Sequence, residues 1–252
     1  MPRAHRMLSA PAAALVIAAM GATPAAAQSH SQSRFEISAN VDAQAAAKKF
    51  TESETFAVNA ETETVTAAHR VKTGLGFNVG AAVRIIPGLW VGAAYAMATM
   101  KPSASVTAVV PHPLLFNTPR TVQGSVSDVA HDEQNVHVDL MYVLPVRAVD
   151  VKVMAGSSIF TVKQDFVSGV RVNETYPFDT ATFASASTTR LSKAAVGFNA
   201  GVDVSRPVSR RVAVGGLVRY GRGNVKFGGG NVGRQTVRAG GIEAAAGVRI
   251  RF

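Results

Sequence analysis

The amino-acid sequence predicts an all-β protein: an eight-stranded antiparallel transmembrane β-barrel, in an up-and-down meander, after a cleaved signal peptide. Three observations predict this fold. Apolar and polar residues alternate along most of the chain. No apolar run after residue 27 reaches the roughly 18 residues of a spanning helix. Short and long connections between the alternating segments follow one another in turn, as in a membrane barrel.

Residues 1–27 have the features of a secretory signal peptide. Two arginines precede a short apolar run at 10–20, and an alanine-rich cleavage site ends at Ala27. The apolar run is too short to span a membrane comfortably. We therefore expect export, with residues 28–252 as one outer-membrane β-barrel domain. The sequence contains 0 Cys, which excludes disulfide bonds and thiolate metal sites.

Eight segments alternate with the period of a β-strand. They begin with Phe35, Ile37, Ala39 and Val41 and continue at about residues 75–85, 89–97, 136–144, 149–155, 196–204, 212–220 and 242–252. Tight links surround Pro87, Pro145 and Pro207, a glycine-rich link of medium length covers 226–235, and the links 51–71, 101–132 and 164–190 are long. An even number of strands places both chain ends on the same side of the membrane.

The two faces of these strands differ in a way that favours a membrane. Large apolar residues occupy one face, whereas Gly, Ala, Asn and a few charged residues occupy the other. The second face is too small and too weakly charged to form the outside of a soluble barrel. An apolar face toward lipid and a polar lumen fit better. A soluble β-sandwich or barrel is the alternative.

The chain ends on an aromatic residue that follows apolar residues at every second position: Ala246, Val248, Ile250 and Phe252. With the signal peptide and the alternation, this ending resembles the small outer-membrane β-barrel proteins of Gram-negative bacteria, of the OmpA transmembrane domain and OmpX type. The resemblance implies location in the cell outer membrane. It also implies that Val248, Ile250 and Phe252 are recognised by the barrel assembly machinery.

Charged residues of both signs are predicted to face the lumen. By strand parity they are Glu36, Asp42, Arg84, His137, Asp139, Lys152, Asp203, Arg219, Glu243, Arg249 and Arg251. A barrel of eight strands has an interior just wide enough for side chains. We expect a charge-paired network that plugs the lumen, and the alternative is a narrow ion path gated by the same pairs. Pairing is expected in both cases because an isolated buried charge is costly.

Basic residues recur at the predicted outer ends of the strands. This basic rim consists of Lys48, Lys49, Arg70, Lys72, Lys101, Lys163, Arg190, Lys193, Arg222, Lys226, Arg234 and Arg238. Lys and Arg form charge-assisted contacts with phosphate, so the basic rim predicts contact with lipopolysaccharide. The alternative is that these side chains only snorkel to the interface. The first long link has an acidic segment, Glu61-Thr-Glu-Thr-Val-Thr, and is predicted to form a hairpin above the membrane.

The sequence gives little support for catalysis. Its histidines are scattered without metal-ligand spacing, and no glycine-rich loop precedes a helix. We expect no enzymatic activity, no cofactor and no metal. The net charge of +10 does not predict nucleic-acid binding, because we expect the chain to be exported. The expected role is structural, or surface interaction and adhesion through the long loops. The alternatives are a narrow porin-like channel for ions or small solutes and an outer-membrane lipid-modifying enzyme.

Overall fold

The computed structural model describes residues 33–45, 48–71, 73–146, 148–229 and 232–252. The chain divides into two units, Met1–Gln32 and Ser33–Phe252, and all described residues belong to the second. The predicted signal peptide and Lys72 lie outside the described residues. No helix in the described part of the chain is long and apolar enough to cross a membrane.

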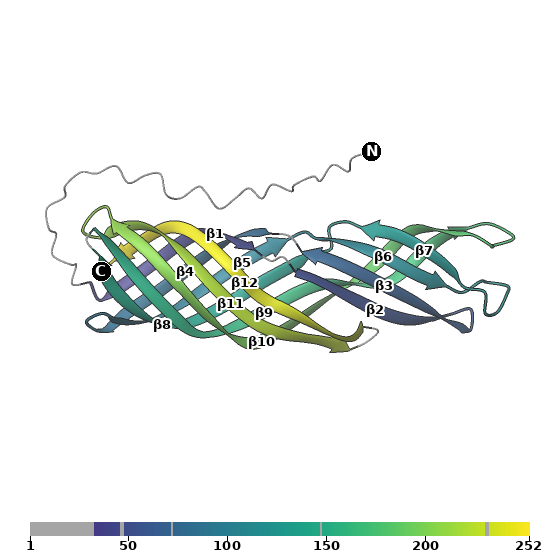
Figure 1. The fold of residues 1–252 in the computed structure, drawn as a ribbon, viewed down its shortest axis with the longest axis horizontal. Coiled ribbons are helices and arrows are strands. Elements are labelled where there is room, and N and C mark those ends of the chain that lie inside the picture. Colours follow the sequence, from purple (N-terminus) through teal and green to yellow (C-terminus); the bar gives the residue numbers. More distant parts are fainter. Residues whose placement is uncertain (1–32, 46–47, 72, 147, 230–231) are drawn as a thin grey trace, which may run out of the picture. The chain divides into compact units, whose positions relative to one another are not determined.

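Eight antiparallel strands close into a barrel (Figure 1). They are β1 (Phe35–Ala45), β4 (Gly74–Ile86), β5 (Leu89–Met100), β8 (His131–Val146), β9 (Val149–Glu174), β10 (Ala181–Pro207), β11 (Val212–Gly229) and β12 (Val232–Arg251). Around the ring the order is β1, β12, β11, β10, β9, β8, β5 and β4, and β4 pairs again with β1. This is the predicted up-and-down barrel, and the eight predicted segments are its strands.

The barrel is closed where the two ends of the described chain meet. The backbone N–H of Phe252 donates to the carbonyl of Phe35 at 2.9 Å, and the N–H of Arg34 donates to the carbonyl of Phe252 at 2.7 Å. Phe252 itself follows the last residue of β12. At the same end, β4 and β5 are joined by the predicted turn at Pro87, where Gly88 has a φ of 84° that favours glycine. We call this end of the barrel the short-turn end.

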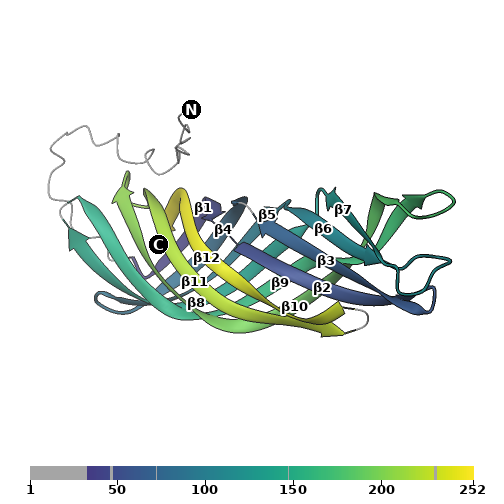
Figure 2. The same ribbon diagram turned by 45° about the vertical axis from the view of Figure 1, so that its right-hand side comes forward.

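Four further strands form a separate sheet in the order β2 (Lys48–Val58), β3 (Glu61–Val71), β6 (Ser103–Val110) and β7 (Arg120–Val126). β9 and β10 continue as a long hairpin beyond the barrel, and β10 packs beside β7 (Figure 2). We call this sheet, together with residues 165–195, the outer unit. The hairpin predicted within residues 51–71 is β2–β3. The links 101–132 and 164–190, predicted only as long loops, contain β6, β7 and the β9–β10 extension.

The outer unit has an apolar interior. Its sheet buries Val65, Ala67, Val106, Ala108, Val110 and Val122 against Val167, Val170, Phe183 and Ala186 of the β9–β10 hairpin. Gly124 leaves room for the Phe183 ring, since a Cβ at Gly124 would lie 2.2 Å from that ring. The outer unit is therefore built like a soluble β-structure, with its apolar side chains inside.

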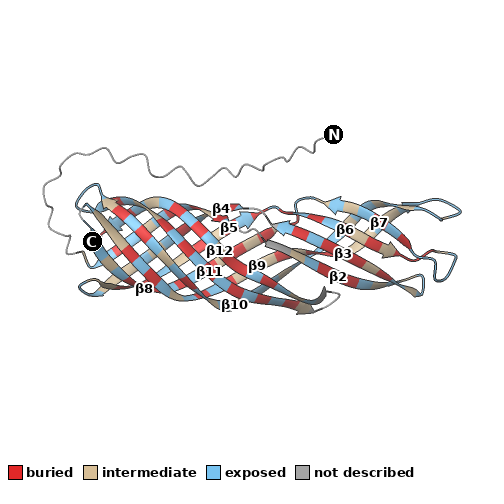
Figure 3. Cartoon of the chain, viewed as in Figure 1, coloured by how far each residue is buried: buried red, intermediate tan, exposed pale blue. Residues whose placement is uncertain are grey.

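The barrel has the opposite arrangement. Buried and exposed residues alternate along its strands (Figure 3). Large apolar side chains point out of the barrel, and polar or charged side chains such as Glu36, Asn78 and Arg249 are buried inside it. The candidate lumen residues are therefore considered below by the side of the barrel wall on which each side chain lies.

Candidate functional site

A belt of exposed apolar side chains surrounds the barrel. It includes Ile37, Val41, Phe77, Val79, Val136, Val138, Leu140, Tyr142, Val153, Ile159, Val196, Phe198, Val202, Val214, Val218, Tyr220, Ile242 and Val248. Val196 is 76% exposed and Val41 is 71% exposed. A soluble monomer rarely exposes so much contiguous apolar surface, and a closed barrel leaves no unpaired strand edge in lipid. The belt is therefore the membrane-facing surface of the barrel.

At the short-turn end, five of the predicted lumen residues form ion pairs inside the barrel. Lys152 bonds to one carboxylate oxygen of Glu36, and the Nε of Arg251 donates to the other at 3.0 Å. The Nε of Arg249 donates to Asp203 at 3.2 Å. β1 and β12 are neighbours in the ring, so Arg251 and Glu36 pair along one wall of the barrel. Lys152 on β9 reaches Glu36 on β1 across the lumen, and Arg249 on β12 reaches Asp203 on β10 past the intervening β11.

A second group of charges lies nearer the middle of the barrel. The guanidinium of Arg219 donates to Asp139 at 3.0 Å and lies 3.7 Å from the carboxylate of Glu243. The amide of Asn78 donates to Glu243 at 2.9 Å. Asp42 is buried, with one carboxylate oxygen that has no hydrogen-bond partner within the described residues.

His137 and Arg84 complete the predicted set. The Nδ1 of His137 lies 2.8 Å from the hydroxyl of Ser158. Ten of the eleven predicted lumen residues are buried, whereas Arg84 is half-buried. Arg84 lies in register with Trp90, next to an irregularity in the β4–β5 pairing near the short-turn end.

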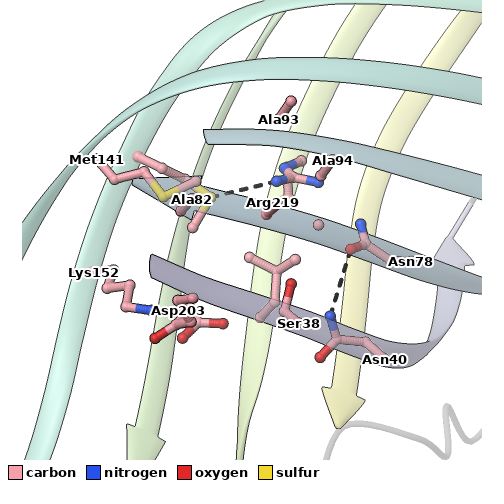
Figure 4. Close-up of a pocket in the computed structure, with 15 residues that line it drawn as sticks. Ser38, Asn40, Asn78, Ala82, Ala93, Ala94, Met141, Lys152, Asp203 and Arg219 are labelled. Carbon is pink, nitrogen blue, oxygen red and sulfur yellow. Dashed lines mark hydrogen bonds and ion pairs between the residues drawn. The ribbon is translucent and has the colours of Figure 1, made fainter. Parts of the chain in front are cut away.

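The space left between these groups is small. Around Ser38, Asn40, Asn78, Lys152 and Arg219, the described residues enclose a cavity of about 40 Å³ (Figure 4). A second cavity, between Arg219 and Phe160, has about 10 Å³. These volumes hold water molecules rather than a solute. The charged part of the lumen is thus filled mainly by paired side chains.

An apolar layer, absent from the sequence prediction, fills the barrel above the charges. Phe160, Val162, Phe166, Val225, Phe227, Val237 and Ala239 are all buried there. Phe160 lies in a socket of glycines: a Cβ at Gly197, Gly221 or Gly223 would come within 2.6–3.1 Å of its ring. Phe50 of β2 packs against this layer, with its ring 6.5 Å from that of Phe166. The lumen is therefore closed twice, by charge pairs and by this apolar layer.

A buried polar cluster also lies in the upper barrel. One carboxylate oxygen of Glu133 accepts hydrogen bonds from the side chain of Gln44 at 2.7 Å and the backbone of Gly240 at 2.9 Å. The other lies 2.9 Å from Nε2 of His131. This contact links β1, β8 and β12 across the barrel interior. His131 and Glu133 share one face of β8, whereas Asp132 points outward.

The structure does not gather the described members of the basic rim into one ring. Arg70 lies on β3 in the outer unit, and Lys48 and Lys49 lie on β2. Arg190 forms ion pairs with Asp132 and Asp165 on the outer surface. Lys101 follows β5, whereas Lys163 on β9 and Lys193 on β10 are one position apart in the β9–β10 register. The remaining four, Arg222, Lys226, Arg234 and Arg238, are exposed together on β11 and β12.

The outer unit ends in a tip with exposed apolar side chains. Outside the barrel, the exposed large hydrophobic residues of the described chain are Leu114, Leu115, Phe116 and Tyr176. We call these four residues the apolar tip. They come from two loops, β6–β7 and β9–β10. The sequence prediction missed this feature, although the uncharged segment Pro111-His-Pro-Leu-Leu-Phe-Asn-Thr-Pro119 was its visible signal.

The two loops of the apolar tip are tied together. The guanidinium of Arg120 donates to Glu174 at 2.6 Å, to the carbonyl of Phe178 at 2.8 Å and to the carbonyl of Pro111 at 2.8 Å. The Nδ1 of His112 accepts the backbone N–H groups of Leu114 and Leu115, each at 3.1 Å. These hydrogen bonds join the β6–β7 loop to the β9–β10 loop.

The protein is an eight-stranded β-barrel with an apolar outer belt. Solved structures similar to it include the outer membrane protein OprG from Pseudomonas aeruginosa, with 9% identity over 88% of this chain and 97% of that chain and a TM-score of 0.49. Neisserial surface protein A has 16% identity over 86% and 97%, with a TM-score of 0.43. Ail, the attachment invasion locus protein of Yersinia pestis, has 12% identity over 87% and 99%, with a TM-score of 0.38. No family model matches the sequence, and no curated protein matches it.

Proposed function

We propose that this outer-membrane barrel is a non-enzymatic surface-contact protein that uses its outer unit for adhesion and its closed barrel as an anchor. The apolar tip is the observation that carries this proposal. Leu115, Phe116 and Tyr176 are large side chains held on tied loops at the end farthest from the short turns. Exposed aromatic and aliphatic residues on a rigid frame are typical of binding surfaces.

The closed lumen supports an anchor over a channel. A conducting path would have to pass both the pairs around Arg219 and the apolar layer around Phe160. Ions enter a dry apolar constriction only at high cost. We therefore expect no stepwise current when the folded protein is added to a planar lipid bilayer. Steps of uniform conductance would contradict the anchor and favour the porin-like alternative.

The tip is tested on whole cells. Gram-negative cells that express the protein should settle faster, or bind hydrophobic beads better, than cells without it. The double variant Leu115→Asp, Phe116→Asp should lose most of this gain at equal surface level, because burying a charge on contact is unfavourable. Thr118→Asp, on the same loop, is the matched control and should keep it. Equal adhesion of wild type and double variant would overturn the proposal.

The C-terminal residues are proposed to direct assembly. Val248 and Ile250 point outward within the belt, and Phe252 is also exposed. An accessible apolar ending is available to the barrel assembly machinery before the seam with β1 closes. Phe252→Ser should lower the amount of folded protein in the outer membrane while synthesis is unchanged. The same amount as in wild type would remove this role.

A further inference from the structure

The four exposed cations on β11 and β12 form one compact group, which we call the cationic patch: Arg222, Lys226, Arg234 and Arg238. In the β11–β12 register, Asn224 lies opposite Arg238 and Lys226 lies opposite Thr236. Each cation is therefore the diagonal cross-strand neighbour of another. Diagonal neighbours in an antiparallel pair are roughly 7–8 Å apart, within reach of long side chains.

The cationic patch has no acidic counterpart on its own surface. In the part of the chain that the structure describes, none of its four residues forms an ion pair, whereas Arg190 on β10 pairs with Asp132 and Asp165. Like charges on neighbouring strands repel one another. The strands thus hold four cations together at a cost that an external anion would relieve.

The depth of the cationic patch is set by its neighbours in the belt. Tyr220 and Ile242 are the last exposed apolar residues below it on β11 and β12. The ring of Tyr220 lies 6.2 Å from that of Phe198, which is opposite Arg222 in the β10–β11 register. Aromatic residues mark the membrane–water interface of such barrels. Arg222 therefore lies at the height of the headgroups.

The other side of the barrel lacks this arrangement. Phe77 and Tyr95 form the corresponding aromatic pair on β4 and β5, with ring centroids 6.2 Å apart. Above it, β5 continues with Thr99 on its exposed side, and Lys101 follows the strand. β5 is thus followed by Lys101 above its aromatic residue, where β11 and β12 carry four cations. A general tendency of basic residues to reach the interface would not select one pair of strands.

We propose that the cationic patch is a binding site for the phosphate groups of a lipid headgroup, with the phosphorylated glycolipid of the outer leaflet, lipopolysaccharide, as its occupant. Arg222 and Arg238 are at the lower level, next to the belt, and Lys226 and Arg234 are farther from it. Arg offers a planar fork of donors and Lys a compact charge, and both suit phosphate oxygens. The site goes beyond the surface-contact role and does not depend on it.

The test uses the folded, detergent-purified protein and lipopolysaccharide as the probe. The variant Arg222→Gln, Lys226→Gln, Arg234→Gln, Arg238→Gln should bind about 100-fold more weakly than wild type, because it loses several charge-assisted hydrogen bonds. The control Arg34→Gln, Arg171→Gln, Arg210→Gln, Arg211→Gln removes the same charge from exposed positions outside the basic rim and should stay within about twofold. A shift on a gel between unboiled and boiled samples shows that both variants are folded.

Two further binding measurements identify the source of the phosphate. Enzymatically dephosphorylated lipopolysaccharide should bind as weakly to wild type as intact lipopolysaccharide binds to the patch variant. Inorganic phosphate at millimolar concentration should not displace the lipid. Equal losses in the patch variant and the control would reduce the effect to net charge and overturn the site. Undiminished binding of dephosphorylated lipid, or displacement by inorganic phosphate, would also overturn it.

Discussion

The barrel and the outer unit are built from the same kind of strand with opposite polarity. In the barrel, the apolar face is exposed and the charged face is buried, whereas in the outer unit Val106, Val122 and their apolar neighbours are buried. The outer unit also buries a few polar side chains of β2 and β3: Glu52, Glu54, Glu63 and His69. Alternation therefore predicts a strand, but the surroundings decide which face is covered. Lipid covers the apolar face of the barrel, and a second layer of strands covers that of the outer unit.

β9 and β10 show the change within single strands. On β9 the inward side chains are Lys152 and Ser158 in the lower barrel, and Phe160 and Phe166 above. On β10 the outward residues are apolar from Val196 to Val204 and polar at the outer end. Up to the first register shift, near Val167 and Thr188, the parity is unchanged while the polarity of each face reverses. The reversal marks the membrane surface.

The largest expected effect comes from breaking a charge pair inside the barrel. Arg219→Met leaves Asp139 and Glu243 buried without their cation, and we expect a loss of about 3–5 kcal/mol in the free energy of unfolding. The double variant Arg219→Met, Asp139→Leu should recover part of it. Urea unfolding in lipid vesicles can be followed by the fluorescence of Trp90, the single tryptophan of the sequence. An unchanged midpoint for the single variant would contradict a paired lumen.

A charge on the apolar face of the barrel is the next largest effect. Leu140→Arg, in the belt on β8, should cost about 2–4 kcal/mol near the middle of the membrane. Thr55→Arg, exposed on β2 in the outer unit, should change stability little. Folding yield into vesicles and the urea midpoint of Trp90 fluorescence measure both. Equal tolerance of the two arginines would mean that the belt does not face lipid.

The reverse experiment places a polar group inside the outer unit. Val106→Asn should destabilise this unit by about 2–3 kcal/mol, since the buried amide lacks partners. Limited proteolysis should then cut within β6 or β7, while the gel shift and the Trp90 signal of the barrel persist. Ser105→Asn, on the exposed face of β6, is the matched control. Loss of the barrel together with the outer unit would show that the two fold as one.

The smallest effect concerns a buried acid of the outer unit. Burial raises the pKa of Glu63 above its ordinary value. The folded state therefore holds the proton more tightly than the unfolded state. Stability falls as the pH rises above the ordinary pKa of a glutamate, because the buried carboxylate must then lose its proton. Glu63→Gln should raise the free energy of opening of β3 at pH 8 by less than about 1 kcal/mol, measured by its resistance to protease. At pH 4 the substitution should leave this free energy unchanged. The opposite pH dependence would contradict the burial.

Strand existence in the barrel could be predicted from sequence because apolar and polar residues contrast strongly there. β6 and β7 alternate too, but Ala104, Val106 and Ala108 alternate with Ser, Thr and Val, so the contrast is weak. Which inward side chains form ion pairs depends on the strand register around the closed ring, and the sequence pattern does not give this register. For this reason parity placed Lys152 and Glu36 on inward faces without indicating that they pair across the lumen.

The apolar layer of the upper barrel was missed for a different reason. A polar lumen was expected along the whole length, yet Phe160 and Val162 have the same parity as the charged residues below them. The glycines at 197, 221 and 223 were the available signal, since they make space for one large ring. Their meaning becomes visible only when three strands are placed side by side.

The cationic patch likewise follows from the register of β11 and β12 rather than from the number of basic residues.

The central claim is that the apolar face of the barrel lies in lipid and that its strands leave the membrane where their polarity reverses. The chain has 0 native Cys, so single cysteines can be placed at outward positions of β10 and spin-labelled in vesicles. Labels at Val196, Ala200 and Val204 should be accessible to oxygen and shielded from a water-soluble nickel chelate, and a label at Ser192 should show the reverse. Equal access of the chelate to all four positions would contradict the account.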